Sequence, residues 1–195
     1  MHTKTAGRSV WTWSAVAASW AGLVVEISLV ATVLFLWGIA HLPPDADSPA
    51  LTVVTLPLWL GVLAVLSVIL TLLLVMPAAT LAYLVGTRGG GGDDAWWWTP
   101  AGAAVVAGAA VGATGLAAGV EAGAVGAPEV YAWWWLAVTA LVVPAALLAR
   151  LSALRTARGR PGGLARPVLA KGCGGVVAFF AVAVAVMLLV DTVVN

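Results

Sequence analysis

One ionisable side chain, Glu26, stands inside the first long apolar stretch of the chain, residues 14–40. If that stretch is a helix crossing a bilayer, Glu26 lies within about 1.5 Å of its midpoint. Insertion scales give a free-energy cost of about 2.5–3.5 kcal/mol for an Asp, Lys or Arg at the centre of a membrane helix. The carboxylate of Glu26 should cost a comparable amount. Intramembrane acids commonly mark ion pathways, so Glu26 is a candidate proton or cation site. The alternative is a structural role between neighbouring helices.

Four hydroxyl side chains fall at comparable depths in later apolar stretches. Two lie at mid-span, one lies a turn toward the inner side, and the fourth lies about 5–6 Å toward the outer side, at 1.5 Å per residue. With Glu26 they predict a small polar layer inside the bundle. Serine and threonine in such helices also bond to carbonyls of their own helix, so a purely structural role is the alternative. Ser67 and Thr139 are the two at mid-span, Thr71 is the one toward the inner side, and Thr114 is the one toward the outer side.

Motifs of known catalytic chemistry are absent from the sequence: there is no G-x-S-x-G, H-E-x-x-H, P-loop or C-x-x-C. A single cysteine, Cys173, excludes an intrachain disulfide. His41, Asp45 and Asp47 could together offer metal ligands, but three such residues in a proline-rich loop are a weak signal. We therefore expect a protein that is not an enzyme and that holds no metal or cofactor.

The composition places the chain among membrane proteins. Of its 195 residues, 63% are hydrophobic and 9% are charged. Soluble domains carry about 45–50% apolar and about 25% charged residues. The net charge of +1 gives no reason to expect a nucleic-acid partner. The sequence thus predicts an all-α integral membrane protein forming one transmembrane domain over residues 1–195.

Five apolar stretches are long enough to cross a bilayer core of about 30 Å. The second lies in an apolar run, 51–86, that would reach about 54 Å as a straight helix. Such a length leaves three possibilities: one tilted or protruding helix, a break near Pro77, or two spans. We expect spans at 14–40, 55–86, 100–120, 130–149 and 174–194.

The basic residues predict how these spans are oriented. All nine Lys and Arg lie in the N-terminal segment and in two linkers, 87–99 and 150–173. With five spans, these three segments lie on the same side, which the positive-inside rule makes cytoplasmic. Two spans within 51–86 would separate them, so one span is favoured. The N-terminus is then cytoplasmic and the C-terminus outside. A cleaved signal peptide is disfavoured because the first apolar run continues to residue 40.

Two sets of glycines spaced by four occur within the third predicted span and just after it. Small residues at such spacing let two helix backbones approach closely, so we expect this face to pack inside the bundle. A homodimer contact through the same face is the alternative. The glycines concerned are Gly108, Gly112, Gly115, Gly119 and Gly123.

These features favour a small multi-pass protein of the plasma or inner membrane that acts as an accessory, scaffold or interaction subunit. The alternative is a small transporter, or a subunit of one, that uses Glu26 as an intramembrane proton or cation site. The expected partners are the lipid bilayer, anionic lipid head groups at the basic linker, or another membrane protein.

Overall fold

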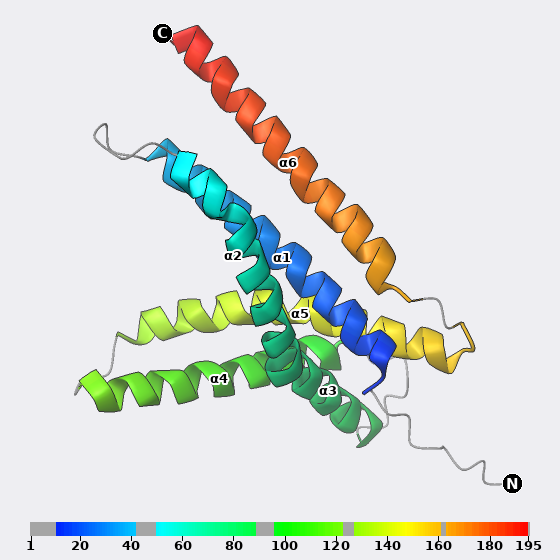
Figure 1. The fold of residues 1–195 in the computed structure, drawn as a ribbon. Helices are drawn as coiled ribbons and strands as arrows, with labels where there is room; N and C mark the ends of the chain where they lie inside the picture. Colours follow the sequence, from blue (N-terminus) through cyan, green and yellow to red (C-terminus); the bar gives the residue numbers. More distant parts are fainter. Residues whose placement is uncertain (1–10, 42–49, 89–95, 123–126, 161–162, 195) are drawn as a thin grey trace, which may run out of the picture.

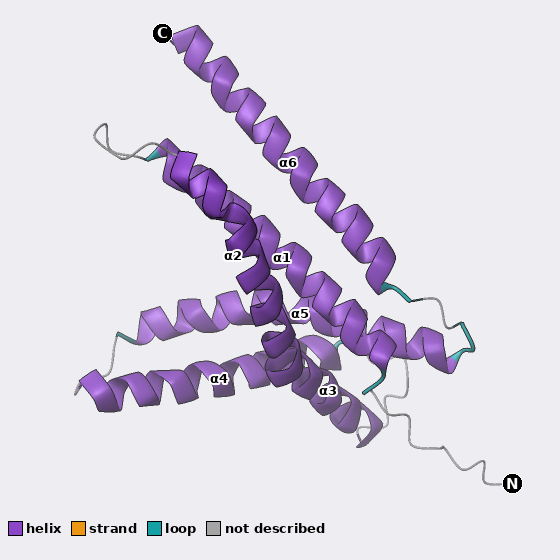
Figure 2. Ribbon diagram, viewed as in Figure 1, coloured by secondary structure: helices purple, strands orange, loops and turns teal. Residues whose placement is uncertain are grey.

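The computed structural model describes residues 11–41, 50–88, 96–122, 127–160 and 163–194. Within these ranges every regular element is helical and no strand is present (Figure 2). Five helices are long and apolar enough to cross a membrane, which confirms the predicted number. The elements are α1 (Trp13–Ala40), α2 (Ala50–Leu70), the π-helical turn η1 (Thr71–Val75), α3 (Met76–Arg88), α4 (Trp98–Ala122), α5 (Pro128–Ala157) and α6 (Ala165–Val194).

The second apolar run forms one helical stretch in which α2, η1 and α3 follow without a loop. The N–H of Met76 donates to the carbonyl of Thr71, five residues earlier, which is the π-helical pattern. Pro77 explains this change, because its ring would clash with the carbonyl of Leu73 in a regular α-helix. The helix therefore widens just before Pro77 and then continues, and a single segment, Gly61–Arg88, meets the requirements for a span.

Two helices extend further than the apolar pattern predicts. The fourth was expected to end at residue 149 and the fifth to begin at 174, but α5 continues to Ala157 and α6 begins at Ala165. Much of the expected 150–173 linker is therefore helical. Hydropathy marks only the part of a helix that suits the bilayer core, whereas residues 151–157 are mostly good helix formers. The end of α5 is followed by Gly159 at a φ of +70°, a common way for a helix to terminate.

The helices converge at one end of the molecule and diverge toward the other (Figure 1). We call the first the closed end: here α1, α4 and α6 begin and α3 and α5 finish. At the opposite, open end, the α4–α5 pair separates from α1, α2 and α6. Helix α1 packs against α2, η1, α5 and α6, whereas α4 packs against α3, η1 and α5.

The apolar core lies where α1, η1, α3, α4 and α5 meet. Leu23 is its largest fully buried side chain. A smaller cluster of alanines joins α1, α3 and α5 nearer the closed end. Small side chains thus bring the helices close together here. The main cluster comprises Leu23, Val75, Ala78, Ala103, Val142, Ala145 and Ala146.

Candidate functional site

Glu26 lies in α1 one turn after Gly22, so the two residues share a face of the helix. Gly22 packs against α5, since a Cβ added there would lie 2.6 Å from Leu148 Cδ1 and 3.7 Å from Ala145 Cα. The Glu26 side chain is half-buried. Its Oε2 atom is buried and has no hydrogen-bond partner among the described residues. The carboxyl group thus has one oxygen held away from solvent and unsatisfied.

A second buried oxygen on the neighbouring helix is also unsatisfied. Thr139 is half-buried in α5, and its Oγ1 has no hydrogen-bond partner within the described segments. Helices α1 and α5 pack along one another. A buried polar atom without a partner costs about 1–3 kcal/mol, so two of them on packed helices need an explanation.

Ser67 and Thr71 point into the bundle and are completely buried. The Ser67 hydroxyl donates to the Ala64 carbonyl at 2.7 Å, and the Thr71 hydroxyl donates to the Ser67 carbonyl at 2.7 Å. Both protons are therefore used within their own helix, as the structural alternative anticipated. The lone pairs of the two oxygens remain able to accept a further bond.

Thr114 lies elsewhere, on the exposed surface of α4 toward the open end. Its hydroxyl bonds to the carbonyls of Ala110 and Val111, both at 3.0 Å. Because α4 packs on α3, η1 and α5, Thr114 is not brought to α1 and Glu26. Four members of the predicted polar layer thus have buried side-chain oxygens inside the bundle, whereas Thr114 is on its exposed surface. The four are Glu26, Ser67, Thr71 and Thr139.

Two glycines of α4, Gly108 and Gly115, pack against aromatic rings of α5. A Cβ at Gly115 would lie 2.6 Å from Tyr131 Cε1, and a Cβ at Gly108 would lie 3.5 Å from Trp135 Nε1. The Trp135 indole also donates to the Ala104 carbonyl at 2.9 Å. The sequence indicated close packing on this face but not that rings, rather than a second backbone, would occupy it.

The remaining predicted glycines differ in their surroundings. A Cβ at Gly112 would meet no atom within 4 Å, so this position is open. Gly119 is half-buried. Gly123 lies outside the described residues.

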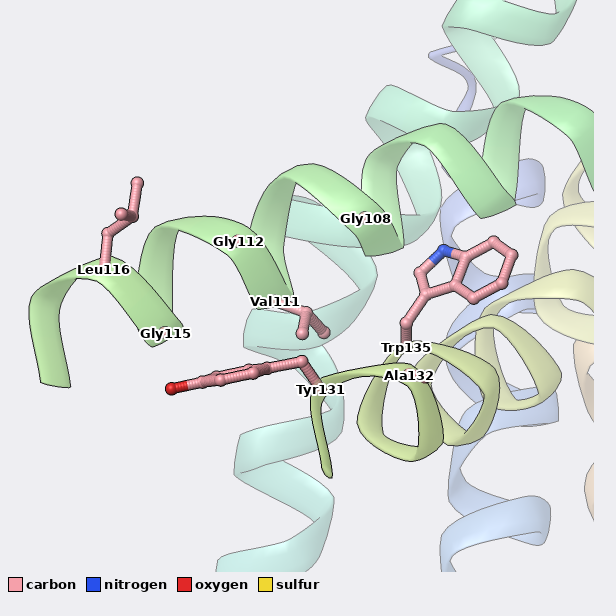
Figure 3. A pocket seen from close by; sticks show the side chains of 8 residues that line it. All are labelled: Gly108, Val111, Gly112, Gly115, Leu116, Tyr131, Ala132 and Trp135. Atoms are coloured by element: carbon pink, nitrogen blue, oxygen red, sulfur yellow. The ribbon is translucent and has the colours of Figure 1, made fainter. Parts of the chain in front are cut away.

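An apolar groove of about 500 Å³ lies along this part of the α4–α5 pair (Figure 3). Its floor is the glycine face of α4, and the rings from α5 form its walls. The lining residues are Gly108, Val111, Gly112, Gly115, Leu116, Tyr131, Ala132 and Trp135. Sequence reasoning did not find this groove, because it depends on which helix packs against the glycines.

Three side-chain hydrogen bonds join different parts of the chain at the closed end. The Trp11 indole donates to Thr80 Oγ1 at 3.1 Å, which links the segment just before α1 to α3. The Ser14 and Thr156 hydroxyls lie 3.1 Å apart and link α1 to the end of α5. Arg150 donates to Thr99 Oγ1 at 3.2 Å and links α5 to α4. The sequence predicted none of these pairs, since partners 51 to 142 residues apart leave no spacing signal.

The fold and these contacts are consistent with a multi-pass membrane protein built from five apolar helices. Comparison with protein families, with curated proteins and with solved structures gives no match for this chain.

Proposed function

We propose that this chain is a multi-pass protein of the cell membrane that acts as a non-enzymatic interaction subunit. In this proposal α6 docks a transmembrane helix of a partner protein. The closed end faces the cytoplasm, so the N-terminus is cytoplasmic and the C-terminus is outside. The described Lys and Arg residues support this orientation, because they lie near the C-terminal ends of α3 and α5, in the turn after α5 and near the start of α6. All of these places are at the closed end, and basic residues favour the cytoplasmic side.

The surroundings of α6 are the observation that carries the proposal. Helix α6 packs substantially against α1 alone. None of the residues in its most apolar window is buried. On the α1 side, Gly172 lies so close to Val25 that a Cβ would clash. Among the side chains of α6 whose burial the structure describes, those that point away from α1 are exposed.

The face of α6 that points away from α1 carries small residues. Spacings of four, four, three and four keep these residues on one side of the helix. All five are exposed, and a Cβ at Gly174 would meet no atom within 4 Å. Small residues in this pattern let another helix approach closely within a membrane. We name this face the α6 stripe: Ala170, Gly174, Ala178, Ala181 and Ala185.

Basic side chains at the closed end give a second contact with the membrane. Arg155, Arg158, Arg160, Arg166 and Lys171 are exposed around the turn between α5 and α6. Such residues attract anionic lipid head groups by about 1 kcal/mol each near the surface. This attraction would hold α6 at its depth while its stripe engages a partner.

The test is the size of the complex that mild detergent extracts from the native membrane. The wild-type chain should migrate well above its own 19.7 kDa with a defined partner. Gly174→Leu should lose that partner, because the leucine blocks close approach. Gly112→Leu is the matched control, since it adds the same side chain at an equally open glycine of α4. A wild-type chain that migrates alone, or an unchanged complex in Gly174→Leu, would contradict the proposal.

The unsatisfied Oε2 of Glu26 favours a second candidate, a small transporter or transporter subunit. In that case Glu26 binds a proton or cation during transport, and Thr139 is available from α5. Proton and cation flux in proteoliposomes should then fall in both Glu26→Gln and Glu26→Ala, with insertion and folding preserved. Equal flux in all three proteins would remove this candidate.

A further inference from the structure

We infer that Lys171 on α6 pairs with Glu26 on α1 inside the bilayer, and that this ion pair fixes the rotation of α6 about its own axis. The inference rests on the proposed membrane insertion, which removes water as the competing partner of both charges. It goes beyond the proposed docking of a partner helix, because it states what keeps the α6 stripe turned away from α1.

Two contacts set the register of α6 on α1. A Cβ at Gly172 would lie 2.8 Å from Val25 Cγ1 and 3.1 Å from Val25 Cβ, so the helices approach closely at this glycine. Nearer the open end, the ring centroids of Phe35 and Phe180 lie 6.3 Å apart. From the first contact to the second, α1 advances by ten residues and α6 by eight. The two helices therefore run side by side in the same direction (Figure 1).

Glu26 and Lys171 lie on the same flank of the contact between Val25 and Gly172. Glu26 is one residue after Val25, and Lys171 is one residue before Gly172. Each residue of an α-helix turns by about 100° around the axis, at 3.6 residues per turn. In two parallel helices, one step forward on the first and one step back on the second lead to the same side. The two residues differ in depth by only about 3 Å, as paired charges beside a coiled-coil seam do.

Each of the two side chains has a reason to pair once it is inside a bilayer. Glu26 is half-buried, and its buried Oε2 has no hydrogen-bond partner among the described residues. Lys171 is exposed on α6, where its ammonium group offers three donors. A lone charge in the bilayer is costly, and intramembrane charged residues pair with one another for that reason. Insertion therefore favours the pair over two separate charges.

Lys171 is the basic residue of the described chain best placed for this role. Arg166 lies five residues earlier on α6, about 7.5 Å nearer the closed end. Arg150 already donates to Thr99 on α4. The other described arginines lie at the end of α3, at the end of α5 or in the turn that follows α5. Pairing withdraws Lys171 from the lipid head groups and leaves that contact to the arginines.

The pair gives Glu26 a function in placing α6. Helix α6 packs substantially against α1 alone, so its orientation depends on this one interface. Buried polar or ionic groups are best attested as devices that set the register of packed helices. A charge pair on one flank of the interface resists rotation, and the α6 stripe then stays on the opposite side of the helix. In the transporter candidate, by contrast, Glu26 has to bind and release a proton or cation.

The first experiment compares the only two lysines of the chain, Lys4 and Lys171, in the full-length protein in vesicles. With both faces accessible, a water-soluble amine reagent should modify Lys171 about tenfold more slowly than Lys4, the ratio for a pair worth about 1.4 kcal/mol. Glu26→Gln should raise the rate at Lys171, because an unpaired ammonium group extends to the interface. Equal rates at the two lysines, or an unchanged rate at Lys171 in Glu26→Gln, would contradict the pair.

Charge reversal tests whether the pair orients α6. Cysteines in place of Phe35 and Phe180, in a Cys173→Ser background, should be joined by a short bifunctional thiol reagent, because the two rings meet. Glu26→Lys should lower the yield, since it places two ammonium groups on one flank. Adding Lys171→Glu should restore the yield. Adding Arg166→Glu instead is the matched control and should not restore it. Equal effects of these two additions would overturn the inference.

A neutral set of variants decides the question if Glu26→Lys does not fold. Glu26→Gln and Lys171→Met should each lower the cross-linking yield, and the double variant should be no lower than either single one, because the same pair is lost in all three. Losses that add up would refute a shared interaction.

Extraction of the same membranes with alkaline carbonate separates this inference from the proposed function. A wild-type chain that stays in the membrane but shows equal lysine rates would overturn the pair alone. A chain released by carbonate would overturn membrane insertion, and the pair with it.

Discussion

The two halves of α4 carry the same mixture of alanine and glycine but meet different surroundings. Toward the closed end, Thr99, Gly102, Ala103 and Ala107 are buried against neighbouring helices. Toward the open end, most side chains after Val111 are exposed. The difference arises because α3 crosses only the first half of α4, whereas α5 follows both. One composition thus provides a packed junction in one half and an uncovered groove floor in the other.

The largest expected effect is the difference in stability lost when a leucine is truncated in the core and at the open end. Leu23→Ala should lower the free energy of unfolding by about 2–5 kcal/mol, because it leaves a cavity in the main cluster. Leu116→Ala removes the same atoms from a side chain that is 70% exposed. Its effect should stay within about 0.5 kcal/mol. Titration of both variants with sodium dodecyl sulfate in mixed micelles measures the two changes, and equal losses would contradict the comparison.

Next in size is a glycine substitution at the closed half of α4. A Cβ at Gly102 would lie 2.8 Å from the Ala78 carbonyl oxygen and 3.2 Å from the Ala82 nitrogen. Backbone atoms cannot rotate away, so Gly102→Ala should destabilise by about 1–3 kcal/mol through overpacking. The same micelle titration measures this value. An increase in stability would show that α3 and α4 are not in close contact here.

A smaller loss is expected at the polar junction of α4 and α5. Thr99 is almost completely buried and accepts a hydrogen bond from Arg150. Thr99→Val keeps the shape but removes the acceptor, and should cost about 1.5 kcal/mol, the lower end for bonds to charged groups. Thr114→Val is the matched control, because that hydroxyl is exposed and bonds only to its own helix. Identical melting temperatures of the two variants would argue against the Arg150 contact.

The smallest expected change has the opposite sign. Gly112→Ala should stabilise the protein by up to about 1 kcal/mol, because alanine favours a helix and its methyl group meets no neighbour. A destabilised Gly112→Ala variant would mean that another segment covers the groove.

The sequence was sufficient to predict the helical class and the number of membrane-length helices, because each depends on hydropathy within one segment. It predicted helix ends less well, because the less apolar segment 150–157, which consists mostly of good helix formers, continues α5 beyond the apolar stretch. It also placed Thr114 together with Glu26 by depth alone. Depth does not say which way a side chain faces, and that is set by the packing partners of α4. The pairs Trp11–Thr80 and Arg150–Thr99 likewise depend on tertiary contacts alone.

We propose that the closed end, with its Lys and Arg residues, is the cytoplasmic end of a five-span bundle. Single cysteines at Thr12, Arg158, His41 and Glu129, in a Cys173→Ser background, test it with a membrane-impermeant maleimide. In intact cells, cysteines at positions 41 and 129 should be labelled, whereas those at 12 and 158 should be protected until the membrane is opened. Labelling of positions 12 and 158 from opposite sides of the membrane would contradict it.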